Sequence, residues 1–376
     1  MISPTTEQDL AEAISDAAGP LRIAGGGTRD IGKPVAGEVL SVAGLSGIVF
    51  YEPGALTLVA RAGTPLAEVE AALAAENQRL AFEPMDHRVL LGTTGTPTVG
   101  GVVAANVSGP RRVQAGACRD HLLGVRFVDG RGGVIGNGGR VMKNVTGYDL
   151  VKLMAGSWGT LGVLSEVSFK VLPRTAASAA LLIDGLPVAQ AVRAMSAALG
   201  SPFEVTGAAH ATRGLGGTPV TIIRIEGFEA SVDYRAGELC KLLDWAGEVT
   251  VETDPSRVAS HWARVRDVVA FADRAGDVWR LSVKPSDAPA IAARLEADEM
   301  LLDWGGGLIW ALMTAGTDAR ARIGTFAGHA TLVRASKATR AALPVFQTEV
   351  APVAAIARGL RAQFDPRGVL NPGLMG

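Results

Sequence analysis

The chain has 376 residues, of which 48% are hydrophobic and 19% are charged, and its formal net charge is −1. The near balance of 36 basic and 37 acidic residues excludes a wholly basic nucleic-acid surface and a wholly acidic one. The length favours two domains, and the two cysteines are too few for a disulfide framework or a cysteine-bound iron–sulfur cluster. Any iron–sulfur centre that works with this chain is therefore expected on another chain.

The first region, up to about residue 175, reads as a mixture of helices and strands. A helix is expected to begin at Thr5, which has capping-box spacing to Gln8, and a hairpin is expected to turn at Asp129-Gly130. The opening residues lack the basic and apolar parts of a secretory signal, and no apolar run is long enough to span a membrane. A cytoplasmic location, or a peripheral one through a partner, is expected. The predicted elements are helices at 5–18 and 65–76, and strands at 21–24, 47–53, 55–63, 122–128, 134–136 and 161–172.

The second region, from about 176 to 340, repeats one order of elements. Strand and helix patterns spell β-α-β-β-α-β twice, and a helix at 256–271 connects the two runs. Two such units predict one broad antiparallel sheet with its helices on one face. The remaining segment, with a helix at 350–363 and the sequence FDPRGVLNPG, is too short to form a domain. We expect it to dock on the first region.

Two glycine-rich segments lie in the first region, at 25–28 and within 92–112, and the second reads as a loop. The first segment matches neither of two known nucleotide motifs: Pro34 stands where a P-loop needs Ser or Thr, and Asp30 replaces the third glycine of a dinucleotide fingerprint. Glycines let backbone N–H groups turn toward an anion, and the interleaved threonines add hydroxyl donors. Two such nests favour a diphosphate ligand; two ordinary tight turns are the alternative.

Longer motifs carry a family resemblance. AGGGT at 24–28, TVGGVVAANVSG at 98–109, GSWGTLGVLSEVSFKVLP at 156–173 and the terminal FDPRGVLNPG resemble the FAD-binding fold of the vanillyl-alcohol oxidase and p-cresol methylhydroxylase (PCMH) family. The resemblance implies an α+β chain in three parts. These are a two-part PCMH-type FAD-binding domain at 1–175, an antiparallel-sheet cap domain of two β-α-β-β-α-β units at 176–340, and a C-terminal helix and tail at 341–376 that return to the FAD domain.

More specific motifs resemble one branch of that family. SGPRR at 108–112, LLDWGGGLIWAL at 301–312 and GHATLVRA at 328–335 resemble the FAD-binding E subunits of bacterial glycolate oxidase. The resemblance implies a flavoprotein subunit of a glycolate (2-hydroxy acid) dehydrogenase complex, which oxidises glycolate to glyoxylate. It also implies a second FAD-binding catalytic subunit and an iron–sulfur subunit that receives the electrons. Two alternatives stay open: a non-catalytic flavin relay or assembly subunit, and an FAD-dependent sugar-nucleotide reductase of the same fold.

The resemblance also implies which residues hold FAD. The first glycine segment takes the pyrophosphate, the second continues toward the isoalloxazine, and the terminal asparagine closes the site. Relatives that bind flavin covalently have a histidine near Thr28 and often a cysteine at the start of the second segment; this chain has neither, so noncovalent FAD is predicted. The implied FAD-binding residues are Gly25, Gly26, Gly27, Thr28, Gly95, Thr96, Thr98, Gly100, Gly101, Asn106, Ser108, Gly159, Gly162, Val163 and Asn371.

Catalytic and metal-binding residues are not assigned. Hydroxy-acid oxidising members of the family carry an HxGDGNxH motif that this chain lacks, and its five histidines have no metal-ligand spacing. His121 and His329 are the two with a functional interpretation, although a structural hydrogen bond is favoured for each. Arg111 and Arg112 stay open between partner docking, anion binding and structural pairing. The other polar cluster consists of Lys143, Asn144, Tyr148 and Asp149.

Overall fold

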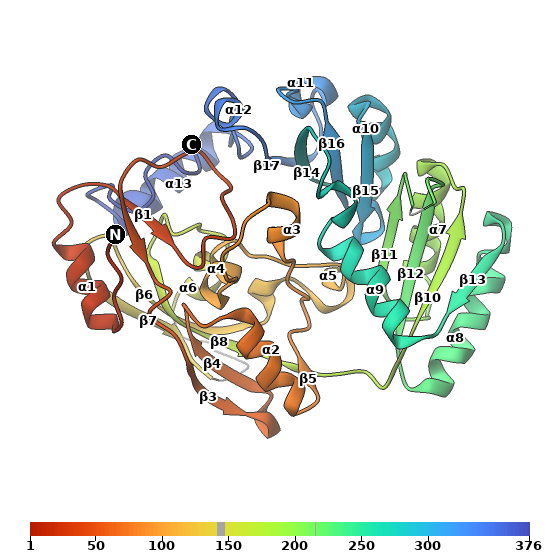
Figure 1. The fold of residues 1–376 in the computed structure, drawn as a ribbon, viewed down its shortest axis with the longest axis horizontal. Helices are drawn as coiled ribbons and strands as arrows, with labels where there is room; N and C mark the ends of the chain where they lie inside the picture. Colours follow the sequence, from red (N-terminus) through yellow and green to blue (C-terminus); the bar gives the residue numbers. More distant parts are fainter. Residues whose placement is uncertain (141–146, 215) are drawn as a thin grey trace. The chain divides into compact units, whose positions relative to one another are not determined.

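The computed structural model describes residues 1–140, 147–214 and 216–376, and this part of the chain divides into two compact units (Figure 1). Unit 1 consists of Met1–Ser108, Ala117–Arg174 and Thr348–Gly376, and unit 2 consists of Gly109–Gly116 and Thr175–Gln347. Each unit is therefore assembled from segments that are distant in the sequence. Lys143 and Asn144 of the predicted polar cluster lie outside the described residues.

Unit 1 is built around a five-stranded antiparallel sheet with the strand order β3-β4-β8-β6-β7. The paired strands and the hairpin predicted from the sequence are confirmed. A small parallel pair, β1 with β2, stands apart from this sheet, and β2 was not expected from the sequence. The strands are β1 (Leu21–Ala24), β2 (Glu38–Ser41), β3 (Ile48–Glu52), β4 (Thr57–Arg61), β5 (Gln78–Arg79), β6 (Leu122–Val128), β7 (Val134–Gly138), β8 (Val163–Lys170) and β9 (Leu172–Pro173).

Several helices of unit 1 begin at a side-chain cap, whereas the second helix and the C-terminal helix have none. The first helix has its capping box at Thr6 and Asp9, not at Thr5 and Gln8, because the Asp9 carboxylate accepts the Thr6 amide at 3.0 Å while Thr6 Oγ1 accepts the Asp9 amide at 3.1 Å. Thr64 does not cap the second helix; its hydroxyl donates to the Arg61 carbonyl at 2.7 Å. The helices are α1 (Glu7–Ser15), α2 (Leu66–Ala75), α3 (His87–Leu91), α4 (Val99–Ala104), α6 (Leu150–Met154) and α13 (Ala351–Phe364).

The end of the chain is part of the core of unit 1. Val369 and Leu370 are buried with Leu10 and Ile14 of α1 and with Leu21 of β1. The Leu21 amide donates to the Val369 carbonyl at 2.7 Å, so the tail pairs with β1 like an additional strand. Burying an aliphatic side chain of this size is worth about 2 kcal/mol, which holds the tail against this edge.

Unit 2 is one eight-stranded antiparallel sheet with the strand order β13-β10-β12-β11-β15-β16-β14-β17, which confirms the single broad sheet. The chain runs β10-α7-β11-β12-α8-β13 and then β14-α10-β15-β16-α11-β17, and the two runs join where β11 pairs with β15. The strands are β10 (Ala177–Asp184), β11 (Val205–Ala211), β12 (Val220–Gly227), β13 (Val249–Glu252), β14 (Asp277–Val283), β15 (Glu299–Asp303), β16 (Leu308–Met313) and β17 (Gly328–Arg334).

Helices cover both faces of this sheet in part. Helix α7 contacts α8 and α10, and α10 contacts α11, so these four form one layer. The connecting helix α9 lies on the other face, because its Trp262 packs against Gly207 and lies under the Arg224 guanidinium. Figure 1 shows α7 and α9 on opposite sides of the strands. The helices are α5 (Arg112–Ala115), α7 (Val188–Leu199), α8 (Glu229–Leu242), α9 (Pro255–Arg266), α10 (Ala288–Leu295), α11 (Ala319–Ile323) and α12 (Lys337–Ala342).

No helix in the described ranges has both the length and the apolar character needed to cross a membrane.

Candidate functional site

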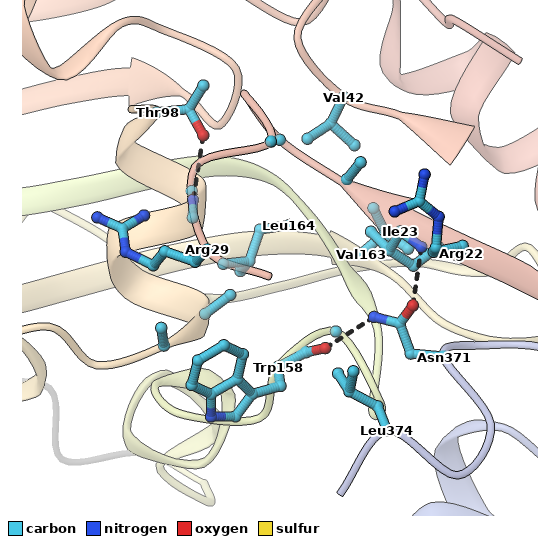
Figure 2. A pocket seen from close by; sticks show the side chains of 18 of the residues that line it. Arg22, Ile23, Arg29, Val42, Thr98, Trp158, Val163, Leu164, Asn371 and Leu374 are labelled. Atoms are coloured by element: carbon cyan, nitrogen blue, oxygen red, sulfur yellow. Dashed lines mark hydrogen bonds between the residues drawn. The ribbon is translucent and has the colours of Figure 1, made fainter. Parts of the chain in front are cut away.

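A pocket in unit 1 brings together the first glycine segment, the start of α4, the segment before β8 and the C-terminal tail (Figure 2). These four segments are far apart in the sequence, and each supplies residues predicted to bind the cofactor. The predicted residues that line the pocket are Gly25, Gly26, Gly27, Thr28, Thr98, Gly100, Gly101, Gly159, Gly162, Val163 and Asn371.

Gly95 and Thr96 are not among the lining residues, because they pack behind the first glycine segment. A Cβ on Gly26 would lie 1.5 Å from the Thr96 carbonyl oxygen, and a Cβ on Gly95 would lie 1.7 Å from the Gly26 carbonyl oxygen. The two segments therefore pack backbone against backbone, which no residue larger than glycine permits at these positions. Their role in this structure is to support the wall of the pocket.

The composition of the second glycine segment predicts a loop, but part of the segment is helical. Residues Val99–Ala104 form α4, and Thr98 caps it by accepting the Gly101 amide on Oγ1 at 3.3 Å. Gly100 lies against Ala62, where a Cβ would come within 2.7 Å of the Ala62 carbonyl oxygen. The glycines thus allow a short helix to lie tight against the sheet while its open side faces the pocket.

Asn106 and Ser108 do not line the pocket either. The Asn106 Oδ1 atom accepts the Arg119 amide at 3.0 Å, and the Ser108 hydroxyl oxygen accepts the Cys118 amide at 2.9 Å. Both side chains therefore hold the segment that leads into β6. In the sequence, a polar residue after a glycine run looks like a residue that contacts the ligand. The fold shows that these two side chains accept backbone amides instead.

Asn371 connects the tail to two other segments of the pocket through side-chain hydrogen bonds. Its Oδ1 atom accepts the Ile23 amide at 2.8 Å and its Nδ2 group donates to the Trp158 carbonyl at 2.8 Å (Figure 2). Asn371 has a φ of 45°, in the left-handed region that asparagine tolerates better than most residues. The residue is buried, and with Leu374 it forms the side of the pocket that belongs to the tail.

Arg29 lines the same pocket, and its significance could not be seen in the sequence. Its Nε atom donates to His87 Nδ1 at 3.3 Å, whereas its buried Nη2 atom has no hydrogen-bond partner among the described residues. Loss of water around the side chain lowers the Arg29 pKa to about 10, although Asp86 favours the charged form. A buried cation with an unused donor is suited to an anionic ligand.

These features fit FAD, whose diphosphate needs close backbone approach and positive charge. The lining offers glycine backbone, the Thr28 and Thr98 side chains and the Arg29 guanidinium. Among the described residues the lining contains no His, Cys or Tyr side chain, the types that attach flavin covalently.

The other candidate residues fall outside the pocket. His121 is buried with its ring 5.6 Å from that of Phe82. Tyr148 is 89% exposed, and Asp149 caps α6 by accepting the Lys152 amide at 3.0 Å. Within the described ranges, no group of three or more His, Cys, Asp or Glu residues is placed to hold a metal ion.

Arg111 has a structural partner in unit 2. Its Nε and Nη2 atoms donate to the two carboxylate oxygens of Glu226, both at 2.9 Å. The Glu226 side chain is only 3% exposed, so this bidentate pair ties the segment Gly109–Gly116 to β12. The structural interpretation of Arg111 is therefore the one its contacts support.

Comparison with known proteins agrees with this site. Residues 1–136 match the FAD binding domain family. The chain is 38% identical over 371 residues to the glycolate oxidase subunit GlcE of Escherichia coli K12, a match that covers 98% of this chain and 95% of that protein. It is 30% identical over 281 residues to the mitochondrial D-2-hydroxyglutarate dehydrogenase of Rattus norvegicus, covering 68% of this chain and 51% of that protein.

A solved structure of alkyldihydroxyacetonephosphate synthase has the same fold. It matches with a TM-score of 0.69 and 16% sequence identity, covering 98% of this chain and 76% of that one. At this identity the likeness shows the fold alone. Together with the family match it confirms a mixed α+β architecture with an FAD-binding domain and a large antiparallel sheet.

Proposed function

The chain belongs to the family of the glycolate oxidase subunit GlcE, and on that premise we propose that it is the FAD-binding subunit of a glycolate (2-hydroxy acid) dehydrogenase complex. The observation that supports this most directly is the match along nearly the whole chain, both units included. The glycine-lined pocket of unit 1, with its buried arginine, supplies the place for the cofactor. The activity assigned is oxidation of glycolate to glyoxylate.

Bound FAD would supply the hydride-accepting and electron-transfer chemistry, while the protein would bind and orient it. Gly25, Gly26 and Gly27 would direct backbone N–H groups at the diphosphate, with Thr28 as a further donor. Arg29 would neutralise part of the diphosphate charge inside the pocket. Asn371 would keep the tail closed over the cofactor and exclude water from that side.

The domain organisation proposed with this function is the PCMH-type one. It comprises a two-part FAD-binding domain at 1–175, a cap domain of two β-α-β-β-α-β units at 176–340, and a returning tail at 341–376. The partners proposed are a second FAD-binding catalytic subunit and an iron–sulfur subunit. A cytoplasmic location, with attachment to the inner membrane through the complex, completes the proposal.

The test is an anaerobic flavin spectrum of the isolated chain and of the reconstituted complex, each with and without glycolate. Bleaching of the isolated chain would support a catalytic subunit. Bleaching in the complex alone would assign oxidation to the partner and leave this chain as a relay or assembly subunit. No flavin bound to the purified chain in either form would contradict the proposal.

Noncovalent attachment of FAD is part of the proposal and has its own measurement. Acid precipitation should release all of the yellow colour into the supernatant, since the lining residues of the pocket offer no attachment side chain. Flavin that stays with the precipitated chain through repeated washing would contradict this.

A further inference from the structure

A second cluster of polar side chains lies on the sheet of unit 2. Trp279 faces the helix layer, because the Arg320 guanidinium of α11 lies 4.7 Å from its ring. Arg280, the next residue of β14, therefore points to the opposite face of the sheet. Across β16 it is paired with Trp310, and on the other side β17 places His329 opposite Ser282, two residues from Arg280. Arg280, Trp310 and His329 thus share one face of three adjacent strands.

The segment Gly109–Gly116 brings a second arginine to the same place. The Trp304 indole N–H donates to the Gly109 carbonyl at 3.1 Å, which fixes the segment to the end of β15. The Arg112 guanidinium lies 4.6 Å from the centre of the Trp304 ring, and the Arg280 guanidinium lies 5.2 Å from it. One indole ring therefore holds two cationic side chains.

The contacts of Arg280 leave its hydrogen-bonding capacity unused. Within the described ranges its guanidinium has no hydrogen bond or ion pair, and it lies against the rings of Trp304 and Trp310. Burial, followed by the positive charge of Arg112, lowers its pKa to about 10, while Asp303 partly offsets this. Loss of water together with the charges of Arg280 and Arg112 also lowers the pKa of His329. The charges here repel one another, and an anion would relieve the repulsion.

We propose that Arg112, Arg280 and His329 bind the carboxylate group of a small organic acid on this face of the unit 2 sheet. A guanidinium is a planar fork of donors that matches a carboxylate with two parallel hydrogen bonds. The two indole rings lie against the fork, with ring centres 5.2 Å and 5.8 Å from the Arg280 guanidinium. The positive charges of Arg280 and Arg112, which lower each other's preference for the charged form, favour an anionic group beside them.

The proposed function supplies the identity of the acid as a 2-hydroxy acid, and the inference rests on it for that step only. Neutral His329 carries one donor and one acceptor nitrogen, so it can bond a hydroxyl group next to the carboxylate. The carboxylate class itself follows from the guanidinium groups. The experiment tests the carboxylate class.

The experiment is calorimetric titration of the full chain with oxamate, a monocarboxylate with no oxidisable C–H bond beside the carboxylate. Arg280→Gln should weaken oxamate binding about tenfold or more, as expected for loss of a charge-assisted pair of hydrogen bonds. Acetamide, which is neutral, should not bind. The matched control is Arg193→Gln, because Arg193 also lies over a tryptophan, Trp245 at 4.2 Å, but is exposed and distant from the cluster in the sequence.

Arg112→Gln is the second variant. It replaces Arg280→Gln in the titration if circular dichroism shows that Arg280→Gln does not fold. It should also lower oxamate affinity about tenfold. FAD content is measured on the same samples, so that loss of flavin, which bears on the proposed function, is separated from loss of acid binding. Unchanged oxamate affinity in the arginine variants, no binding by the natural chain, or tighter binding of inorganic phosphate than of oxamate would each overturn the carboxylate site.

Discussion

Arg29 occupies the space beside Gly101, where an added Cβ would lie 3.2 Å from the Arg29 Nη1 atom. Gly101 has helical backbone angles inside α4, so a larger side chain there is accommodated by the backbone but not by the pocket. The position therefore separates cofactor binding from folding.

Replacement of Gly101 should remove FAD while leaving the fold intact. Gly101→Val places two methyl groups against Arg29 and Thr98, and we expect a flavin-to-protein ratio at least about tenfold lower, which corresponds to about 1.4 kcal/mol of lost binding. The ratio is read from the absorption spectrum of the purified protein. Gly237→Val is the control, because Gly237 is exposed on α8 and has nothing near its Cβ position. A normal flavin content in Gly101→Val would contradict the assignment of the second glycine segment.

Removal of the Arg29 charge should weaken FAD binding without weakening the apoprotein. Arg29→Met removes a buried guanidinium whose Nη2 atom has no hydrogen-bond partner among the described residues, so the apoprotein should unfold at the same or a higher temperature. FAD affinity, measured by fluorescence quenching on titration of the apoprotein, should fall about tenfold or more. Arg22→Met is the matched control, since Arg22 lines the pocket but is exposed. Equal FAD affinity in both variants would refute a role for the buried charge.

The tail should lose its hold on the pocket when the Asn371 side chain is removed. Asn371→Gly keeps the left-handed backbone conformation but leaves the Ile23 amide and the Trp158 carbonyl without their partner. Two buried hydrogen bonds at about 1 kcal/mol each predict a loss of about 2 kcal/mol in the free energy of unfolding of unit 1, measured by urea denaturation. The control is Asn77→Gly, which replaces an exposed asparagine with a φ of 53°. Its free energy of unfolding should stay unchanged. Equal urea midpoints for the two variants would contradict the role of Asn371.

The sequence predicted those features whose signal lies in neighbouring residues. The strand and helix patterns of unit 2 predicted the order of its elements, because each element is recognised from a run of neighbouring residues. The glycine segments and Asn371 were found through motifs. Arg29 and Arg280 were not found, because a single arginine beside a glycine run or inside a strand has no distinctive spacing, and its importance arises from neighbours brought in by the fold.

The same limit explains Asn106 and Ser108. Their place next to the second glycine segment suggested contact with the cofactor, but their side chains bond the backbone of residues 118 and 119. The division of the chain shows the limit at a larger scale. Gly109–Gly116 continues the glycine segment in sequence yet belongs to unit 2, because Glu226 and Trp304 bind it there.

Mild acid should destabilise unit 2 through His210. This side chain is 1% exposed, its Nδ1 atom lies 3.0 Å from the Thr221 hydroxyl, and burial lowers its pKa to about 4. The unfolded chain, with a histidine pKa of about 6.5, binds a proton between these values while the folded chain does not. Stability is therefore full above pH 6.5 and falls by about 3 kcal/mol as the pH drops to 4. Urea denaturation across this range should show a flatter profile for His210→Gln; an unchanged profile would contradict the assignment.

The pocket of unit 1 has a further property that comes from the order of its parts along the chain. Asn371 and Leu374 follow Thr175–Gln347, so the ribosome makes the larger part of unit 2 before the last wall of the pocket exists. At typical translation rates this interval is on the order of ten seconds. During that time the nascent chain carries both glycine segments but lacks the tail that pairs with β1. The complete pocket of unit 1 is therefore available only after most of unit 2 has been synthesised.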